Sequence, residues 1–249
     1  MNYIKILIFA MVSITIVSCD LTKEVEIELP EYEGRLFVEC YLEPGQPMNL
    51  VLTRTSPYFE SFPTNSLDFL DGILEDEAVV TITHKGQVYE LENALSFNKG
   101  TQKVINYKNS TPVPEDYEND FELSITTVDG ETITASTRII EPTPIDSVVA
   151  EFATTDTLAR ILVYLTDDQT VDNYYRRTMH EGSLDSIPSM SFPVDDRVAE
   201  DVIVFGTFFA YAEGDTIINT IYSIDEAYFD FLQSINFAIQ YNRHPFSQP

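Results

Sequence analysis

Apolar and polar residues alternate along much of the chain from residue 35 onward, which is the pattern of half-buried β-strands. In residues 35–42 every second position is apolar, at Leu36, Val38, Cys40 and Leu42. Pro44-Gly45-Gln46-Pro47 then predicts a turn, and residues 48–55 predict a returning strand. This spacing places Cys40 in the core as a small apolar residue rather than as a reactive thiol.

Two further pairs of alternating runs predict hairpins. They are residues 77–84 and 87–92 around Lys85-Gly86, and residues 121–127 and 132–139 around Asp129-Gly130. Strands joined by short turns form antiparallel sheets, and several of them within about 100 residues are typical of a sandwich. We therefore expect residues 35–141 to form an immunoglobulin-like antiparallel β-sandwich.

The stretch Glu141-Pro142-Thr143-Pro144-Ile145 predicts a boundary, because two prolines this close stiffen a connection and do not fit a central strand. Beyond it we expect a second β-rich domain at residues 146–249. Its predicted elements are strands at residues 158–166 and 173–180, an acidic loop at 182–201, and a hairpin of residues 202–212 and 216–223 around Glu213-Gly214-Asp215.

One segment near the end of the chain has helical spacing. Ser223 and Glu226 have the Ser-x-x-Glu spacing of a capping box, and Pro245 ends the pattern. The apolar residues at helical spacing are Ile224, Tyr228, Phe231, Ile235 and Ile239. The sequence therefore predicts an amphipathic C-terminal helix at about residues 224–241, with this apolar face packed on the strands.

The first 20 residues follow another pattern. Lys5 precedes an apolar run at residues 6–17. A helix that crosses a bilayer needs about 20 apolar residues, so this run is too short, and residues 1–18 predict a secretory signal peptide. The run ends in Ile16-Val17-Ser18-Cys19, which resembles the lipobox of bacterial lipoproteins. The resemblance implies cleavage before Cys19 and lipid attachment to this cysteine. The alternative is an ordinary signal peptide followed by an incidental cysteine.

The formal net charge of −27 restricts the partners of the protein. Nucleic-acid binding needs Lys and Arg contacts to phosphate, and anionic headgroups repel an acidic protein. We therefore expect no nucleic-acid partner, and we expect lipid on Cys19 to hold the protein at the membrane. Residues 19–34 are rich in glutamate and predict an acidic tether. With Cys19 lipidated, Cys40 has no disulfide partner.

Sequence motifs for catalysis are scarce. The chain has no nucleophile elbow, phosphate-binding glycine loop, dinucleotide fingerprint or Cys-x-x-Cys pair, and His84, His180 and His244 lie in different segments. Asp167-Asp168 and Asp195-Asp196 could hold calcium or act as general acid and base, although neighbouring acids are expected by chance among 41 acidic residues. We predict no catalytic residues, no metal site and no cofactor, and a carboxylate-based hydrolase is the less favoured alternative.

Several segments, taken in order, are similar to one family. They are residues 36–42 (Leu-Phe-Val-Glu-Cys-Tyr-Leu), 52–58, 142–147 (Pro-Thr-Pro-Ile-Asp-Ser), 174–176 (Tyr-Tyr-Arg) and 242–249. Their order resembles the Bacteroidota outer-membrane lipoprotein family named as domain of unknown function 4249. Two departures stand out: Cys40 occupies a position where the family usually has glycine, and the family normally continues past Pro249 into a glycine-rich stretch.

The resemblance implies a lipid-anchored protein on the outer membrane that faces the cell exterior. Asp20, Glu24 and Glu26 resemble the acidic signal that directs such lipoproteins to the surface. Because family members often lie beside receptor genes, we expect a non-catalytic accessory subunit of a TonB-dependent receptor or another outer-membrane barrel. The alternative is a stand-alone carbohydrate- or peptide-binding lipoprotein.

Residues 56–71 predict a long loop without strand alternation. Its aromatic residues Tyr58, Phe59 and Phe62 form a candidate partner-binding loop, since aromatic side chains often anchor protein contacts. The alternative is that they cover the end of the N-terminal core.

The lipobox leads to a direct prediction about the anchor. Cys19→Ala should remove the sulfur that carries the lipid, so the protein should be left uncleaved or released from the membrane fraction. Cell fractionation and intact mass spectrometry measure both effects. A wild-type protein without acyl mass at residue 19 would contradict the prediction.

Overall fold

The computed structural model describes residues 34–56, 70, 72–99, 103–154, 157–197 and 201–241. Residues 35–249 form one compact unit. The predicted signal peptide, Cys19 and nearly all of the tether lie outside the described residues, as do Tyr58, Phe59 and Phe62. Within the described part of the chain, no helix has both the length and the hydropathy that are required to cross a membrane.

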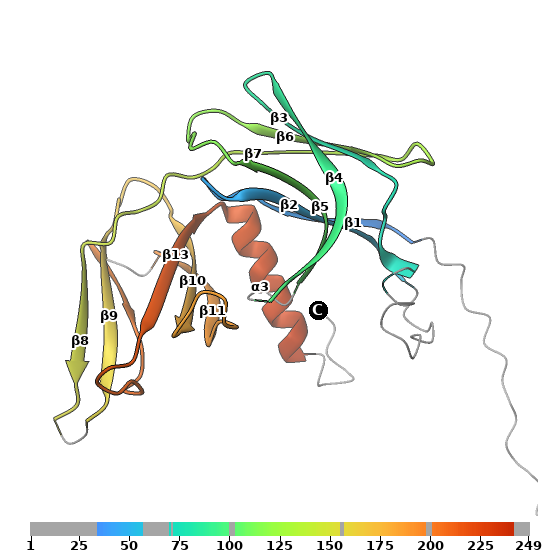
Figure 1. Cartoon of the computed structure of the whole chain (residues 1–249). Helices are drawn as coiled ribbons and strands as arrows, with labels where there is room; N and C mark the ends of the chain where they lie inside the picture. The colour runs from blue at the N-terminus through green and yellow to red at the C-terminus, as the bar shows by residue number, and fades with distance from the viewer. Residues whose placement is uncertain are drawn as a thin grey trace, which may run out of the picture. The chain divides into compact units, whose positions relative to one another are not determined.

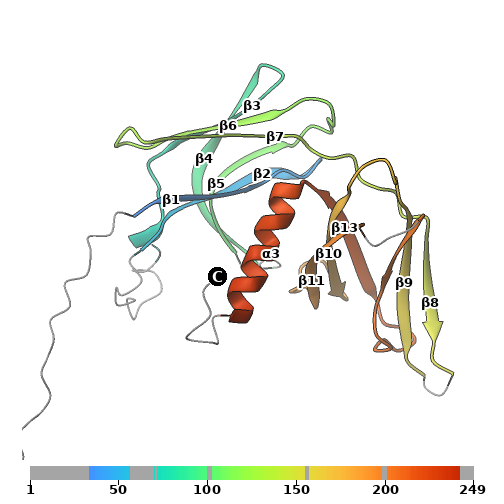
Figure 2. The same cartoon turned by 180° about the vertical axis from the view of Figure 1, so that it is seen from behind.

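The first half of the described chain forms a seven-stranded antiparallel sheet (Figures 1 and 2). Its order is β1-β2-β5-β4-β3-β6-β7. The strands are β1 (Leu36–Tyr41), β2 (Pro47–Arg54), β3 (Val79–His84), β4 (Gln87–Asn98), β5 (Lys103–Pro112), β6 (Phe121–Thr126) and β7 (Thr132–Thr137). The first two predicted strands and both predicted hairpins are confirmed. The alternation does not reveal β5, because the buried Asn106 interrupts its apolar pattern.

The long strand β4 joins the two halves of this sheet. Its first part pairs with β3 from Gln87 to Leu91, and its second part pairs with β5 from Glu92 to Asn98. The register shifts between Asn93 and Ser96, and such a bulge bends a strand and increases its twist. The sheet therefore curls, so that β2 and β5 share one core with β3 and β6.

Ten buried side chains form that core: Met48, Leu50, Leu52, Val80, Ile82, Leu91, Tyr107, Val113, Phe121 and Ile125. They come from both halves of the curled sheet, which therefore encloses its core between two layers as a sandwich does. The predicted inward face of β1 packs against this core, Cys40 included. Burial raises the pKa of the Cys40 thiol to about 12, as expected for a core residue rather than a reactive one.

The second half contains two three-stranded antiparallel sheets, with orders β12-β9-β8 and β11-β10-β13. Their strands are β8 (Ser147–Phe152), β9 (Ala159–Thr166), β10 (Tyr174–Glu181), β11 (Met190–Asp195), β12 (Val202–Gly206) and β13 (Ile217–Ile224). A second core contains residues of both sheets, namely Val163, Leu165, Tyr175, Ile203 and Phe205. The mainly β fold with a C-terminal helix is thus confirmed.

Two predictions for this half are wrong. The strands around Glu213-Gly214-Asp215 do not form a hairpin, because β12 pairs with β9 whereas β13 pairs with β10 in the other sheet. The chain after β12 continues along β9, where the Thr207 amide donates to the Ile161 carbonyl and the Tyr211 amide to that of Ala159. The acidic segment that predicts a loop contains β11, a strand at the edge of its sheet with Pro193 in the middle.

The C-terminal helix is confirmed as α3 (Glu226–Tyr241), but its cap and buried face differ from the prediction. Asp225 caps it, since its Oδ1 accepts a hydrogen bond from the Tyr228 amide at 2.8 Å. Ser223 instead belongs to β13. Phe229, 2% exposed, is the buried anchor of the helix and contacts Tyr174.

Three residues of the predicted inward face lie exposed on α3: Phe231, Ile235 and Ile239. The helix packs on β10 and β11 through a neighbouring face that includes Phe229. Because the two faces lie next to each other on the helix, spacing alone does not decide which one is buried.

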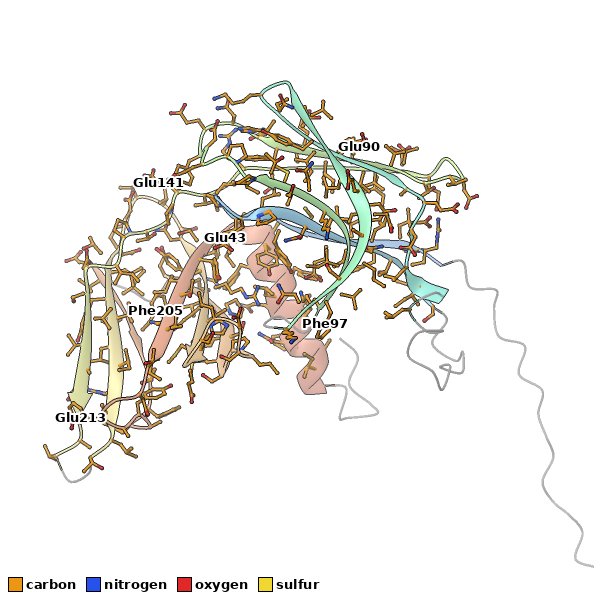
Figure 3. All side chains as sticks on the ribbon, in the orientation of Figure 1. Glu43, Glu90, Phe97, Glu141, Phe205 and Glu213 are labelled. Carbon is orange, nitrogen blue, oxygen red and sulfur yellow. The ribbon has the colours of Figure 1, made fainter. Side chains whose placement is uncertain are left out.

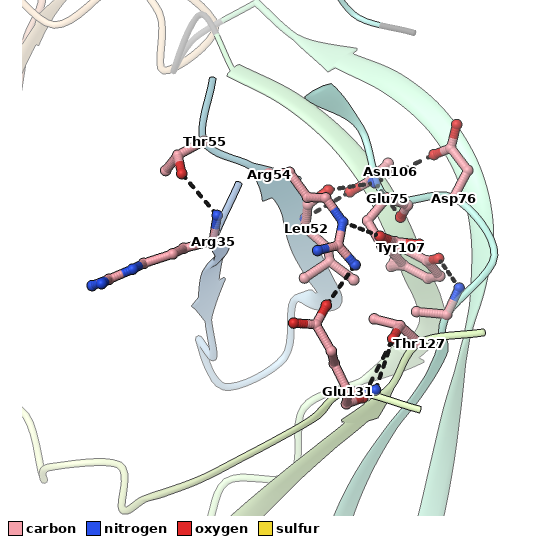
Figure 4. A network of polar contacts seen from close by, with 11 residues as sticks. Arg35, Leu52, Arg54, Thr55, Glu75, Asp76, Asn106, Tyr107, Thr127 and Glu131 are labelled. Atoms are coloured by element: carbon pink, nitrogen blue, oxygen red, sulfur yellow. Dashed lines mark hydrogen bonds and ion pairs between the residues drawn. The ribbon is translucent and has the colours of Figure 1, made fainter. Parts of the chain in front are cut away.

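Asn106 closes the curled sheet at the point where β2 and β5 separate (Figure 4). Its Oδ1 accepts a hydrogen bond from the Leu52 amide, and its Nδ2 donates to the Leu52 carbonyl, both at 2.9 Å. The same Nδ2 lies 3.2 Å from the Glu75 carbonyl oxygen. A side-chain amide thus supplies the donor and acceptor of the missing strand neighbour.

Asn106→Ala should lower the free energy of unfolding by about 3 kcal/mol, because it leaves the Leu52 amide and the Glu75 carbonyl without this partner in the core. Urea unfolding monitored by circular dichroism measures the change. The matched control is Asn93→Ala, which removes an exposed amide that donates to Asp76 and should cost less than about 0.5 kcal/mol. Equal losses in the two variants would contradict the role of Asn106.

Candidate functional site

The structure brings together one member of each acidic pair in the sequence. Asp167 follows β9 and Asp196 follows β11, and Asn173 binds both, since its backbone amide donates to Asp196 and its side chain donates to Asp167. The other members point elsewhere. Asp168 accepts hydrogen bonds from Thr170, and Asp195 forms an ion pair with Arg197. Neither adjacent pair acts as a unit.

Asp167 and Asp196 are held by groups of the same chain. Asp196 is buried, and its Oδ2 accepts a hydrogen bond from the Asn173 amide at 2.7 Å. Asp167 accepts hydrogen bonds from the side chains of Asn173 and Gln169. Burial, together with the neighbouring Asp196 carboxylate, raises the pKa of Asp167.

This geometry ties the segment from residue 167 to 173 to the end of β11. The two carboxyl groups of a glycosidase lie about 5–9.5 Å apart with substrate or water between them, whereas Asn173 of the same chain bridges these two. Among the described residues, no group of three His, Cys, Asp or Glu side chains is arranged to hold a metal ion. The hydrogen bonds from Asn173 and Gln169 are those of a structural pair.

A pocket of about 240 Å³ lies beside the acidic pair. Its walls come from the connection after β7, the start of β10, the end of β13 and the first turn of α3, and they consist of Ile140, Glu141, Thr143, Asp172, Asn173, Tyr174, Tyr175, Ser223, Ile224, Asp225 and Glu226. We call it the junction pocket. Figure 3 labels Glu141 on the connection between β7 and β8.

Polar contacts hold the junction pocket together. The Thr143 amide donates to Ser223 Oγ at 3.3 Å, and the Thr143 hydroxyl lies 3.2 Å from that of Tyr175. Tyr174 donates to a Glu226 carboxylate oxygen at 3.0 Å. Burial raises the pKa of Tyr175. Because four carboxyl groups line the pocket, a group that enters it would have to be cationic or a hydrogen-bond donor.

Two histidines that stand apart in the sequence also lie apart in the structure. His84 is buried and stacks on Phe121 with ring centroids 3.9 Å apart, while its Nε2 lies 3.2 Å from Asp116. His180 is buried on β10. The third, His244, lies outside the described residues.

Arg177 is a buried residue that the sequence pattern does not reveal. It is 1% exposed within the second core, where Nε donates to Asn219 Oδ1 at 3.0 Å and Nη1 donates to the Gly206 carbonyl at 2.8 Å. Its guanidinium lies 5.6 Å from the ring centre of Phe205, which Figure 3 labels. Arg177 thus links β12 to β10 and β13, and burial lowers its pKa. A single arginine in an alternating strand gives no signal of such burial.

The sheet β12-β9-β8 has an exposed apolar surface. Strand pairing places Val149, Leu162, Tyr164, Val202 and Val204 on the face opposite to the core residues Val163 and Leu165. Val149, Val202 and Val204 are exposed, and Leu162 and Tyr164 are half-buried. Soluble monomers rarely expose large contiguous apolar patches, so this surface is a candidate for contact with another molecule.

These features define a β-rich protein whose polar side chains fasten a large curled sheet to two smaller sheets and whose outer strands expose apolar residues. The chain belongs to the family described as Domain of unknown function (DUF4249), whose model matches residues 22–249. No curated protein matches the chain. Two of the segments that carry the sequence resemblance, residues 142–147 and 174–176, contribute Thr143, Tyr174 and Tyr175 to the junction pocket.

The acidic pair predicts an unusual pH dependence of stability. Because the pKa of Asp167 is raised in the folded state, ionisation of this carboxyl group destabilises the fold. The destabilisation is absent at a pH below the pKa of the unfolded state, and it grows as the pH rises through the pKa of the folded state. Asp167→Asn should therefore raise the melting temperature at pH 7 by about 2 °C. The gain should shrink toward pH 3.

Thermal unfolding followed by circular dichroism between pH 3 and pH 8 measures this effect. Asp168→Asn is the matched control, because hydrogen bonds from Thr170 lower the pKa of Asp168 and stabilise its charged form. This variant should lower the melting temperature at pH 7. A fall for both variants would show that the Asp167 charge is stabilising.

Proposed function

We propose that the protein is a non-catalytic, lipid-anchored subunit on the outer face of the outer membrane. There it would contact a barrel protein such as a TonB-dependent receptor. Its lipid on Cys19 would hold the folded unit at the membrane through the acidic residues 19–34. The family to which the chain belongs and the lipobox at Ile16-Val17-Ser18-Cys19 support this setting.

The observation that carries the proposal is the exposed apolar surface of sheet β12-β9-β8. In a protein without a partner, the exposed side chains of Val149, Val202 and Val204 contribute no stability, whereas a partner that covers them removes apolar area from solvent. Protein contacts are typically organised around such apolar centres with polar rims. An ion pair between Glu151 and Arg160 borders this surface on the same face of the sheet.

The second candidate function is a stand-alone carbohydrate- or peptide-binding lipoprotein, whose ligand would enter the junction pocket. Its volume of about 240 Å³ is below the 300–1,000 Å³ that is usual for ligand pockets, so it matches one side chain better than a sugar chain. The pocket is therefore compatible with a lysine or arginine of a partner protein. We place the receptor-subunit function first for this reason.

The proposal predicts that a barrel protein copurifies with the lipidated protein from native membranes in mild detergent. Replacing Tyr58, Phe59 and Phe62 together with serine should reduce this copurification at least about 10-fold if the loop anchors the contact, since such residues often dominate binding. Folding, measured by the melting temperature, and surface display, measured by whole-cell protease accessibility, should persist.

A matched control replaces three aromatic or apolar residues that are exposed on β4 and the helix, Phe97, Phe231 and Ile235, with serine. This variant tests whether loss of any exposed apolar side chain weakens the complex. A melting temperature that collapses in the Tyr58, Phe59 and Phe62 variant would assign the loop to packing. Failure of any barrel to copurify with the wild type would contradict the proposed function itself.

A further inference from the structure

The edge strand β8 is exposed on both faces and along one side. It pairs only with β9 among the described strands, and all six of its residues are exposed. Figure 1 shows β8 at the outer edge of its sheet. Val148 and Phe152, which are 59% and 50% exposed, lie on the side of the sheet that bears the second core. Val149 belongs to the opposite apolar surface.

The hydrogen-bond pattern shows which backbone groups of β8 are available. The Ala153 amide donates to the Leu158 carbonyl at 3.0 Å, so this pair closes the β8–β9 ladder as a hydrogen-bonded pair. Antiparallel pairs alternate between hydrogen-bonded and non-hydrogen-bonded. Val148, Ala150 and Phe152 therefore direct their amide and carbonyl groups away from β9, toward the free side of the strand.

The β12 side of β9 confirms this alternation. The Thr207 amide donates to the Ile161 carbonyl, and the Ala210 amide donates to that of Ala159, so the odd-numbered residues of β9 face β12. The even-numbered residues of β9 consequently face β8, opposite Ser147, Val149 and Glu151.

Natural sheets usually protect such an edge with lysine, proline, a bulge or a very short strand. Two edge strands of the small sheets show such devices: β11 has Pro193 in its middle, and β12 has five residues. The edge strands β13 and β7 also lack lysine and proline, but β13 is half-buried along its length and β7 exposes mainly threonine and serine. β8 has six residues in regular register with β9, without lysine or proline. Its one charged residue, Glu151, forms an ion pair with Arg160 of β9.

We infer that β8 is a docking strand to which an extended segment of another protein adds as a further strand of sheet β12-β9-β8. The backbone groups of Val148, Ala150 and Phe152 form the ladder, and the apolar side chains on both faces of β8 contact alternate side chains of the added strand. This inference rests on the proposed function, because it specifies the kind of segment through which the partner binds.

The charge of the protein decides between two occupants of this edge. A second copy would bring another formal charge of −27 to the interface and would be repelled. The added strand therefore belongs to a different protein, has apolar side chains at every second position, and carries no excess of acidic residues.

Ala150→Pro tests the inference in the lipidated protein in its native membrane. Proline removes the outward amide of Ala150 and leaves the β8–β9 ladder intact, as edge strands tolerate. A benzoylphenylalanine at position 152 serves as the photo-cross-linking probe. We expect an adduct with a partner segment of alternating apolar residues, and we expect Ala150→Pro to reduce its yield at least about 10-fold.

Two matched controls accompany this test. Thr134→Pro places proline at the corresponding position of the β7 edge. The Thr127 amide donates to the Glu131 carbonyl, so by alternation Thr132, Thr134 and Ser136 direct their backbone groups away from β6. It should leave the adduct unchanged. The same probe at Phe97, an exposed residue of β4, should not give the proline-sensitive adduct. Should Ala150→Pro unfold, Val148→Ser with Phe152→Ser should weaken copurification of the same partner about 10-fold.

Several outcomes would overturn the inference: no adduct from position 152, an adduct insensitive to Ala150→Pro, an adduct with a second copy of this chain, or a cross-linked segment without apolar alternation. The proposed function fails separately. If the proline-sensitive adduct contains a protein other than a barrel, the docking strand stands and the receptor-subunit function falls. If a barrel copurifies undiminished with Ala150→Pro, the receptor-subunit function stands and the docking strand falls.

Discussion

The N-terminal fold depends on one buried carboxamide. Where β2 and β5 separate, the backbone groups of Leu52 lie buried in the core, and unpaired polar groups there are costly. Asn106 satisfies them through both atoms of its amide, while the adjacent Tyr107 hydroxyl accepts a hydrogen bond from the Ala78 amide. These contacts hold the segment before β3 against β2 and β5. The two halves of the sheet can then enclose one core.

The C-terminal region meets the same need for closure with a different residue. Its sheets have three strands each, so neither can bury a large area by itself. Arg177 links them by donating to the Gly206 carbonyl and to Asn219 while its guanidinium packs near aromatic rings. The second core covers β9 and β10 but leaves β8 exposed. The exposed apolar surface thus follows from the small size of the sheets.

This arrangement suits a protein that acts through its surfaces. Hydrogen bonds between Thr143, Ser223 and Tyr175 position the connection between the large sheet and the small ones. The Asp167–Asp196 pair holds the neighbouring segment although the raised pKa of Asp167 makes its charge unfavourable there. Rigid supports of this kind allow edge strands to stay exposed without loss of the fold. Lipid attachment through Cys19 would then bring those strands close to a membrane partner.

The sequence alone determined the local features of this protein. Alternation and turn dipeptides predicted β1, β2 and the two hairpins, because register within a hairpin depends on neighbouring residues and on a turn such as Lys85-Gly86, where both φ angles are positive. The inward position of Cys40 followed from the same alternation. The resemblance to a lipobox and the ordered family segments are likewise local, and the family follows from those segments.

Only the tertiary structure decided the pairings between distant segments. It separated β12 from β13, made Asp225 rather than Ser223 the helix cap, and buried Phe229 instead of the face with Phe231. It also joined Asp167 to Asp196 and buried Arg177. In each case several partners satisfy the local pattern equally well, and the choice depends on which surfaces meet when the sheets pack. Spacing along the chain does not determine which surfaces pack together, because these contacts form between residues far apart in the sequence.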